Sequence, residues 1–480
     1  MAAARGLAAA AMLACANRLP NGARASVAPA AAPNAVDVWL TTADGATLLA
    51  RQPDRTLGSG PPPAGTTLIV DDATQYQEMF GFGAAMTDAS AYLIERRMSA
   101  AQRDALMREL FGRHPGLGLS FMRLTIGASD FSLHHYSFDD LPAGQRDPEL
   151  RHFSIDSNRA YLLPAVKHAL AINPRLEVMA SPWSAPGWMK TTGSLVKGTL
   201  TADSYAPFAE YLRRYVRAYE AEGVPIFALT VQNEPHFEPE NYPGMALDPA
   251  ARARLLRDHL GPLFARDGLK TQILDWDHNW DQPESPLAVL GDSGAARYVS
   301  GVAWHCYNGN VSAQGRVHDS HPDKDAWFTE CSGGNWSPDF AANLRFFIGT
   351  LIIGGTRHWA RGVLLWNLAL DENYGPHLGG CADCRGVVTI GSTTGSVTRN
   401  VEYYALAHAS QFVRPGARRV ASSSDVDSVQ SVAFRNVDDG SKVLIVLNTA
   451  RVERMVIVQW KGKSFNFVVP AGAAVTCHWA

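Results

Sequence analysis

The sequence predicts an α/β protein that combines a (β/α)8 TIM barrel with an accessory all-β sandwich. Two patterns predict this fold class. Between residues 76 and 412, eight short apolar segments alternate with amphipathic helical segments, and from residue 413 to 480 the strand-like segments are separated by turns alone. A single core rarely grows beyond about 250–300 residues. A chain of 480 residues therefore has room for two cores.

The predicted barrel strands are rich in β-branched and aromatic residues, as is usual for parallel strands buried on both faces. They are residues 80–85, 121–126, 177–182, 226–231, 271–276, 301–307, 326–329 and 363–368. Helical segments with one apolar face lie between most of them, such as residues 100–110, 160–171, 205–222, 250–267 and 338–353. Eight such units close a parallel barrel. An open doubly wound sheet is the alternative, but Gly81-Phe82-Gly83 does not extend into the GxGxxG phosphate motif.

Both ends of the chain contribute to the predicted sandwich. Residues 36–75 contain two strand-like segments, which cannot form a stable sheet alone. Residues 413–480 contain four more, at positions 429–434, 441–447, 455–460 and 465–469. We therefore expect the N-terminal strands to join the C-terminal ones in one sheet system.

The first 35 residues have the pattern of an export signal followed by a linker. Arg5 precedes a short apolar run, and Ala23-Arg24-Ala25 fits a cleavage site, so residues 1–25 are predicted to be a signal peptide and residues 26–35 a linker. This predicts a secreted or periplasmic protein. A lipoprotein anchor at Cys15 is the weaker alternative, because Met12 fits such a site poorly. No other stretch reaches transmembrane length.

Charge and cysteine usage exclude other classes of protein. The formal net charge is −3, which provides no basic field for nucleic acid. Five cysteines follow the signal, an odd number that argues against a dense disulfide framework. Cys381 and Cys384 are spaced to close a small disulfide loop, and a lone CxxC does not favour zinc. Cys306 and Cys331 are predicted to be buried thiols.

Two strand-like segments end in a glutamate. One reads Ile226-Phe227-Ala228-Leu229-Thr230-Val231-Gln232-Asn233-Glu234-Pro235, and the other places Glu330 after Ala326-Trp327-Phe328-Thr329. α/β barrels carry their active sites at the carboxyl ends of the strands, and strands four and seven lie across the barrel mouth. The simpler interpretation of either residue is a strand-end glutamate held by an arginine. Two carboxylates on one rim, however, are what glycoside hydrolysis requires.

We assign Glu234 as the general acid/base and Glu330 as the nucleophile. An ionised Glu330 nearby is expected to raise the pKa of Glu234, because like charges a few ångströms apart disfavour a second negative charge. Arg123 is expected to keep Glu330 ionised.

Polar and aromatic residues follow most of the other predicted strands. A single residue of this kind is more often structural, but recurrence on one edge favours a sugar site. Asn233 is suited to the sugar 2-hydroxyl group. The further candidates for substrate binding are Asp88, Arg123, Asp130, Trp183, His305, Tyr307, Trp366 and Asn367, with Trp188 beside them.

Four motifs resemble glycoside hydrolase family 30, the glucosylceramidase family. They are Phe80-Gly81-Phe82-Gly83-Ala84-Ala85-Met86-Thr87-Asp88, Ser181-Pro182-Trp183-Ser184-Ala185-Pro186-Gly187-Trp188-Met189-Lys190, Gln232-Asn233-Glu234-Pro235 and Trp366-Asn367-Leu368-Ala369-Leu370. The resemblance implies a retaining β-glycosidase with Glu234 and Glu330 in the roles given above, and no metal or cofactor. It also implies a sugar subsite lined by Arg123, Asp130, Trp183, Asn233, His305, Tyr307 and Trp366.

Three functions remain open. The preferred one is a glucosylceramidase-type enzyme that releases glucose and ceramide from glucosylceramide, so that the binding partner is a carbohydrate or a glycolipid. The alternative is an endo-β-1,6-glucanase, because the loop at residues 379–386 resembles that of microbial enzymes with this activity as much as that of lysosomal-type glucosylceramidases. The third, a carbohydrate-binding protein without catalysis, is disfavoured by the presence of both Glu234 and Glu330.

Overall fold

Residues 34–480 are described by a computed structural model. The predicted signal peptide and most of the predicted linker lie outside the described residues. Eight parallel strands close a barrel in the order β10-β12-β4-β5-β6-β7-β8-β9, which confirms the predicted TIM barrel. The barrel strands are β4 (Gly81–Ala85), β5 (Phe121–Ile126), β6 (Glu177–Pro182), β7 (Ala228–Thr230), β8 (Gln272–Asn279), β9 (Gly301–His305), β10 (Asp325–Glu330) and β12 (Ala360–Leu365).

Side chains fill the interior of the barrel. Trp327 is fully buried and contacts Phe80, Phe121 and Phe227, with ring centroids 5.1–5.6 Å apart. These large rings come from positions in or directly before several strands and pack against one another in T-shaped or tilted arrangements. The barrel is therefore a packed core, and its ligands must bind at the rim.

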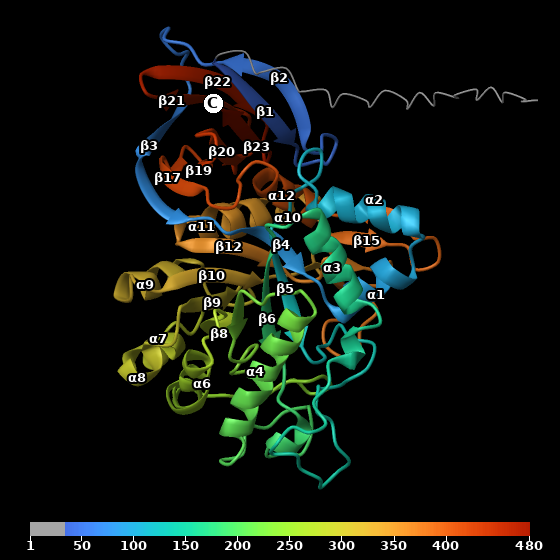
Figure 1. The fold of residues 1–480 in the computed structure, drawn as a ribbon. Helices are drawn as coiled ribbons and strands as arrows, with labels where there is room; N and C mark the ends of the chain where they lie inside the picture. The colour runs from blue at the N-terminus through green and yellow to red at the C-terminus, as the bar shows by residue number, and fades with distance from the viewer. Residues whose placement is uncertain (1–33) are drawn as a thin grey trace, which may run out of the picture. The chain divides into compact units, whose positions relative to one another are not determined.

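Helices cover the outside of the barrel (Figure 1). In α4 (Tyr205–Ala221), the buried residues Phe208, Leu212, Tyr215 and Tyr219 recur at the spacing of one helical face. The other helices are α1 (Asp88–Arg96), α2 (Ala100–Phe111), α3 (Leu162–Ile172), α5 (Pro249–Arg254), α6 (Gly261–Arg266), α7 (Glu284–Gly291), α8 (Ser293–Ala296), α9 (Ser312–Ser320), α10 (Phe340–Arg345), α11 (Gly355–Arg357) and α12 (Val401–Ser410). π-Helical residues Leu255–Leu260 join α5 to α6, and Phe346–Gly354 join α10 to α11.

The sandwich strands come from both ends of the chain, as predicted (Figure 1). Their order is β2-β1-β23-β20-β19-β17-β3-β21-β22, with β18 paired to β19. β1 and β23 pair antiparallel from Val36 opposite Trp479 to Thr41 opposite Ala474. The strands are β1 (Ala35–Thr41), β2 (Ala50–Thr56), β3 (Thr66–Glu78), β17 (Arg418–Ser422), β18 (Asp425–Val426), β19 (Val429–Arg435), β20 (Lys442–Asn448), β21 (Arg454–Trp460), β22 (Lys463–Val469) and β23 (Ala474–Trp479).

A buried histidine joins the last helix of the barrel to the sandwich. His408 of α12 hydrogen-bonds Thr476 Oγ1 at 2.8 Å and Thr41 Oγ1 at 2.9 Å. Burial lowers the pKa of His408 to about 3, so the ring is neutral. A neutral imidazole supplies one donor and one acceptor, which suits a bridge between two hydroxyl groups.

The loops after β10 and β12 carry small sheets at the rim. β11 (Gly333–Gly334) pairs with β14 (Cys384–Arg385), and β13 (Ala369–Leu370), β15 (Val388–Ile390) and β16 (Val397–Arg399) form a second sheet. These pairings fix long loops that rise above the carboxyl ends of the barrel strands.

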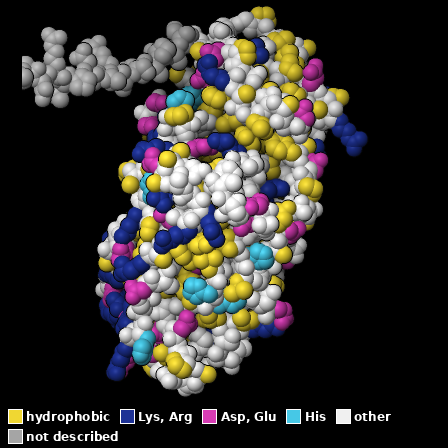
Figure 2. Space-filling model, turned by 90° about the vertical axis from the view of Figure 1, so that its right-hand side faces the viewer, with side chains coloured by type: hydrophobic (Ala, Val, Ile, Leu, Met, Phe, Trp, Pro, Cys, Tyr) yellow, Lys and Arg dark blue, Asp and Glu magenta, His cyan; other side chains and the backbone are white. Residues whose placement is uncertain are grey.

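The surface shows charges of both signs. On the face in Figure 2, Lys and Arg side chains are interspersed with Asp and Glu side chains, with hydrophobic patches between them. Within residues 34–480, no helix has both the length and the apolar character that crossing a bilayer requires.

Candidate active site

The candidate site is a pocket of about 570 Å³ at the rim of the barrel, and both Glu234 and Glu330 line it. Glu330 is the last residue of β10, and Glu234 follows β7. Asn233 N donates to Pro182 O, and Glu234 N donates to Asp277 O. The backbone of Glu234 then turns with φ 46°, a left-handed conformation that costs energy for a residue other than glycine. Such strain is typical of functional positions.

Arg123 lies buried behind the carboxylates. Its guanidinium group donates to Glu330 Oε2, to Asn233 Oδ1 at 2.7 Å and to Asp277 Oδ2 at 2.7 Å. The short, charge-assisted contacts fix one oxygen of Glu330 in place.

Asp277 is a central residue that the sequence analysis missed. It lies at the end of β8 and collects hydrogen bonds from several strands: from Arg123, Ser181, Thr230, His305 and Thr329. Burial raises the pKa of Asp277, but the charges of Arg123 and His305 outweigh burial and hold it well below the usual range. The run Asp275-Trp276-Asp277-His278 at a strand end was the available signal.

His305 connects the two glutamates to Asp277. Its Nδ1 lies 3.0 Å from Glu234 Oε1 and 3.8 Å from Glu330 Oε1, and its Nε2 lies 3.0 Å from Asp277 Oδ1. Burial lowers the pKa of His305, but the charges of Glu330 and Asp277 and the bonds to its partners raise it to about 9. The ring is therefore protonated at neutral pH, and both nitrogens donate.

The pKa values of the two glutamates run opposite to the prediction. Burial raises the pKa of Glu234, but the His305 hydrogen bond and the charges of His278 and His305 outweigh it, so the pKa is lowered. Burial and the negative charges of Glu234 and Asp277 raise the pKa of Glu330 despite His305 and Arg123. The prediction considered Glu234, Glu330 and Arg123 alone, and the position of His305 reverses it.

The surroundings of the two carboxylates differ. Glu330 is held at both oxygens, because Tyr307 Oη donates to Oε1 at 2.9 Å and Arg123 donates to Oε2. Among the described residues, the hydrogen-bond partner of the Glu234 carboxylate is His305, at Oε1. The Glu234 side chain is also more exposed, at 14% against 7% for Glu330. One oxygen of Glu234 thus remains accessible to a ligand.

The deep wall of the pocket is aromatic. Trp183 and Trp366 stack with ring centroids 5.1 Å apart, and Arg123 lies 4.8 Å from the Trp183 ring. Asp130 is buried beside them. Burial and the charge of Glu330 raise the pKa of Asp130 to about 8, so it is mainly protonated at neutral pH and can both donate to and accept from a hydroxyl group.

Four predicted substrate-binding residues do not line the pocket: Arg123 and His305, which lie buried behind the carboxylates, and Asp88 and Asn367. Asp88 accepts a hydrogen bond from Tyr136 Oη at 2.9 Å, and Asn367 accepts one from Thr87 Oγ1 at 2.8 Å. Trp188 donates to Asp139 instead. Both Asp88 and Asn367 are buried behind the rim, because each residue belongs to the packing between α1 and the loop after β12. The pocket is instead completed by Phe237, Tyr242 and Trp336, which lie on loops and which sequence reasoning missed.

Cys306 and Cys331 form a disulfide, and the prediction of two free thiols was wrong. β9 and β10 are neighbours, with His305 opposite Glu330, so the residues that follow each of them meet. The disulfide thus links the two strands one residue beyond their last paired position. Cys381 and Cys384 form a second disulfide on the pocket wall, and Cys477 is free and buried.

Two clusters among the described residues have donor atoms suited to a metal. Glu234, His278 and His305 place such atoms within 4.8 Å of one another, as do Asp139, Asp147 and His152. In the first cluster a cation would compete with the proton on His305. The geometry there favours acid–base chemistry.

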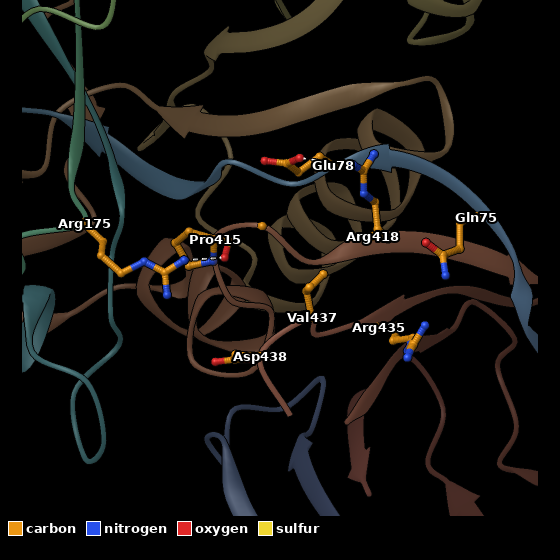
Figure 3. Close-up of a pocket in the computed structure, with 9 residues that line it drawn as sticks. Gln75, Glu78, Arg175, Pro415, Arg418, Arg435, Val437 and Asp438 are labelled. Atoms are coloured by element: carbon orange, nitrogen blue, oxygen red, sulfur yellow. Dashed lines mark hydrogen bonds and ion pairs between the residues drawn. The ribbon is translucent and has the colours of Figure 1, made fainter. Parts of the chain in front are cut away.

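A second hollow, of about 510 Å³, lies beside β3 and β17 (Figure 3). Its acidic side chains are paired with arginine: Glu78 with Arg418 at 3.2 Å, and Asp438 with Arg414 at 2.5 Å. It offers no free carboxylate pair of the kind found at the rim.

Two glutamates stand at the rim of this (β/α)8 barrel, one after β7 and one at the end of β10, which are the fourth and seventh barrel strands. This arrangement is that of a glycoside hydrolase. The chain belongs to glycosyl hydrolase family 30: the profile of its TIM-barrel domain matches residues 79–413, and that of its beta sandwich domain matches residues 416–477. It is a retaining glycosidase of this family.

Relatives in the family carry two activities in their names. An endo-1,6-beta-D-glucanase of Neurospora crassa is 33% identical over 91% of this chain and 94% of its own length. The putative glucosylceramidase 4 of Caenorhabditis elegans is 31% identical over 81% of this chain and 78% of its own length. The solved structure of the endo-beta1,6-glucanase BT3312 is 32% identical, with a TM-score of 0.84 over 93% of this chain and 99% of that chain.

Replacing both Cys306 and Cys331 by alanine is expected to lower kcat by roughly ten- to a hundredfold with little change in KM. The disulfide flanks Glu330, and a small displacement of a reacting group has a large effect on rate. Steady-state kinetics on an aryl β-glucoside measures both constants. The matched control replaces Cys381 and Cys384, which lie beside Asp130, and should change mainly KM. Equal kcat values in all three proteins would contradict a positioning role.

The protonated state of His305 predicts a pH dependence of stability. Its pKa is about 9 in the folded protein and roughly 6.5 in an unfolded chain, so the folded state holds an extra proton between these values. The stabilisation is complete below about pH 6.5 and is lost as the pH rises to about 9. Thermal unfolding should show a steeper fall in Tm over this range in the wild type than in His305→Asn. Parallel curves would exclude the assignment.

Proposed function

We propose that the protein is an endo-acting hydrolase of β-1,6-linked glucan that retains the anomeric configuration. The observation that carries this proposal is the chemistry of the pocket wall. Among the described residues that line it, none is Lys or Arg, while Glu240, Asn241 and Asp383 stand beside the aromatic rings. Hydroxyl-rich, uncharged ligands match such a wall, and anionic ligands do not.

The relatives also support the glucanase. The endo-1,6-beta-D-glucanase covers more of both chains than the glucosylceramidase does, and the solved endo-β1,6-glucanase aligns over nearly its whole length. Glucosylceramide remains the second candidate. The exposed rings of Phe237 and Trp336 favour it, because they would also accept an alkyl chain.

The proposed reaction has two displacement steps. Glu330 attacks the anomeric carbon, the glycosidic bond breaks, and Glu234 gives its proton to the departing oxygen. Glu234 then takes a proton from water, whose oxygen displaces Glu330 from the anomeric carbon. Nδ1 of His305 lies 3.0 Å from Glu234 Oε1 and 3.8 Å from Glu330 Oε1, so the two carboxylates are close together, and direct attack requires a separation of about 5–5.5 Å.

Glu234 must carry a proton when the glycosidic bond breaks, although the hydrogen bond from His305 lowers its pKa. A bound sugar removes water from the exposed side of Glu234, and this further burial favours the neutral carboxylic acid. The N-terminal signal pattern supports export, so the substrate would be an extracellular polysaccharide.

The substrate is tested by chromatography of products from linear β-1,6-glucan and, in parallel, from detergent-dispersed glucosylceramide. Short oligosaccharides from the glucan and intact lipid are expected. Free glucose and ceramide, with the polymer intact, would replace the proposal with the glucosylceramidase.

The proposed roles of Glu330 as nucleophile and Glu234 as acid/base are tested with the variants Glu330→Gln and Glu234→Gln. Glu330→Gln should abolish turnover of all substrates, since no glycosyl-enzyme forms. Glu234→Gln should lose at least about 10²-fold on glucan and less on an aryl glucoside whose leaving group needs no proton. Full activity of Glu330→Gln would refute the assignment.

A further inference from the structure

The exposed aromatic residues of the protein are concentrated in one place. Among residues 34–480, three aromatic side chains are more than a third exposed: Phe237 at 46%, Tyr307 at 45% and Trp336 at 55%. All three line the catalytic pocket. Exposed rings grouped at one site indicate a binding surface, because large apolar side chains otherwise pack in the interior.

The pocket changes character from its base to its mouth. At the base, Trp183, Trp366 and Asp130 are buried and line the pocket together with the two carboxylates. At the mouth, Phe237 and Trp336 are exposed. A polymer that places one ring at the base must place the next ring at the mouth.

Phe237 lies close in the chain to Glu234, the proposed proton donor. Its backbone N donates to Glu234 O at 2.9 Å, which closes a tight turn between the two residues. The general acid must face the departing oxygen, and Phe237 lines the same pocket only three residues after it, which favours a place for Phe237 on the leaving-group side.

Trp336 is held in its exposed position by the small sheet at the rim. Asn335 N donates to Asp383 O at 2.9 Å, and Ser337 N donates to Gly334 O at 3.2 Å. The indole ring lies over Gly334, where a Cβ atom would come within 1.9 Å of a ring carbon. Glycine at this position is what allows the ring to lie flat against the chain.

We propose that Phe237 and Trp336 form an acceptor subsite that binds the leaving-group glucosyl unit of an uncharged β-glucan. Pyranose rings stack on the two aromatic faces, the carboxylates of Glu240 and Asp383 accept hydrogen bonds at the edges, and the Asn241 amide can donate one. The assignment to glucan rests on the proposed function. The position of the subsite rests on the contacts given above.

The test compares linear β-1,6-glucan with β-glucosyl fluoride, whose leaving group carries no sugar ring. In Trp336→Ala and Phe237→Ala, the loss of kcat/KM on glucan is expected to exceed the loss on the fluoride by about tenfold. Gly334→Ala should give a similar ratio, because it displaces the Trp336 ring without removing it. Val452→Ala, an equally exposed apolar residue on the sandwich, should change neither rate. Equal losses on both substrates would overturn the subsite.

A second arm separates the subsite from the proposed function. Wild type and variants hydrolyse β-glucosyl fluoride with the β-1,6-linked disaccharide of glucose added as acceptor, and transfer to the disaccharide is measured. If the enzyme hydrolyses glucan, but transfer to the disaccharide does not depend on Trp336, the proposed function is retained and the subsite is refuted. Transfer that depends on Trp336, in an enzyme without activity on the polymer, would refute the endo-glucanase and retain the subsite.

Discussion

The buried guanidinium group of Arg123 is the interaction on which the site depends. It is fully buried and pairs with Asp277 and Glu330 at the same time. A charge without partners at this depth would cost several kcal/mol, and so would either carboxylate without Arg123. The three groups therefore stabilise one another as a set. They come from β5, β8 and β10, so the charge set also fixes how these strands meet at the rim.

His305 extends this set to the second glutamate. Its position between Asp277 and Glu234 makes it a cation at neutral pH, and one network then contains two cations and three carboxylates. Glu330 is held rigidly by this network, while Glu234 stands at its edge. This difference in mobility fits the two proposed roles. The nucleophile must point at the anomeric carbon in a fixed direction, whereas the acid/base must reach first the oxygen of the leaving group and then that of water.

The strand-end pattern was sufficient to predict the barrel, the sandwich and the rim positions of Glu234 and Glu330. It did not single out Asp277, because the strand was expected to end at Trp276 and the acidic run after it was not read as part of the rim. The positive φ angles of Trp276 and Asp277 leave no trace in the hydrophobic pattern. Phe237 and Trp336 lie on loops, where periodicity carries no information. The reversal of the glutamate pKa values depends on distances to His305, which no sequence spacing provides.

The pairing of β1 with β23 has a consequence for the timing of biosynthesis. β1 is among the first described segments to be made, and its partner is the last. At a synthesis rate of about 5–20 residues per second, the edge of β1 that pairs with β23 stays without its hydrogen bonds for tens of seconds. His408 likewise lacks both hydroxyl partners until Thr476 arrives. The barrel can close before β23 has been made, but the sheet that supports it is completed only once residues 474–479 are available, and its open edge is exposed to other nascent chains until then.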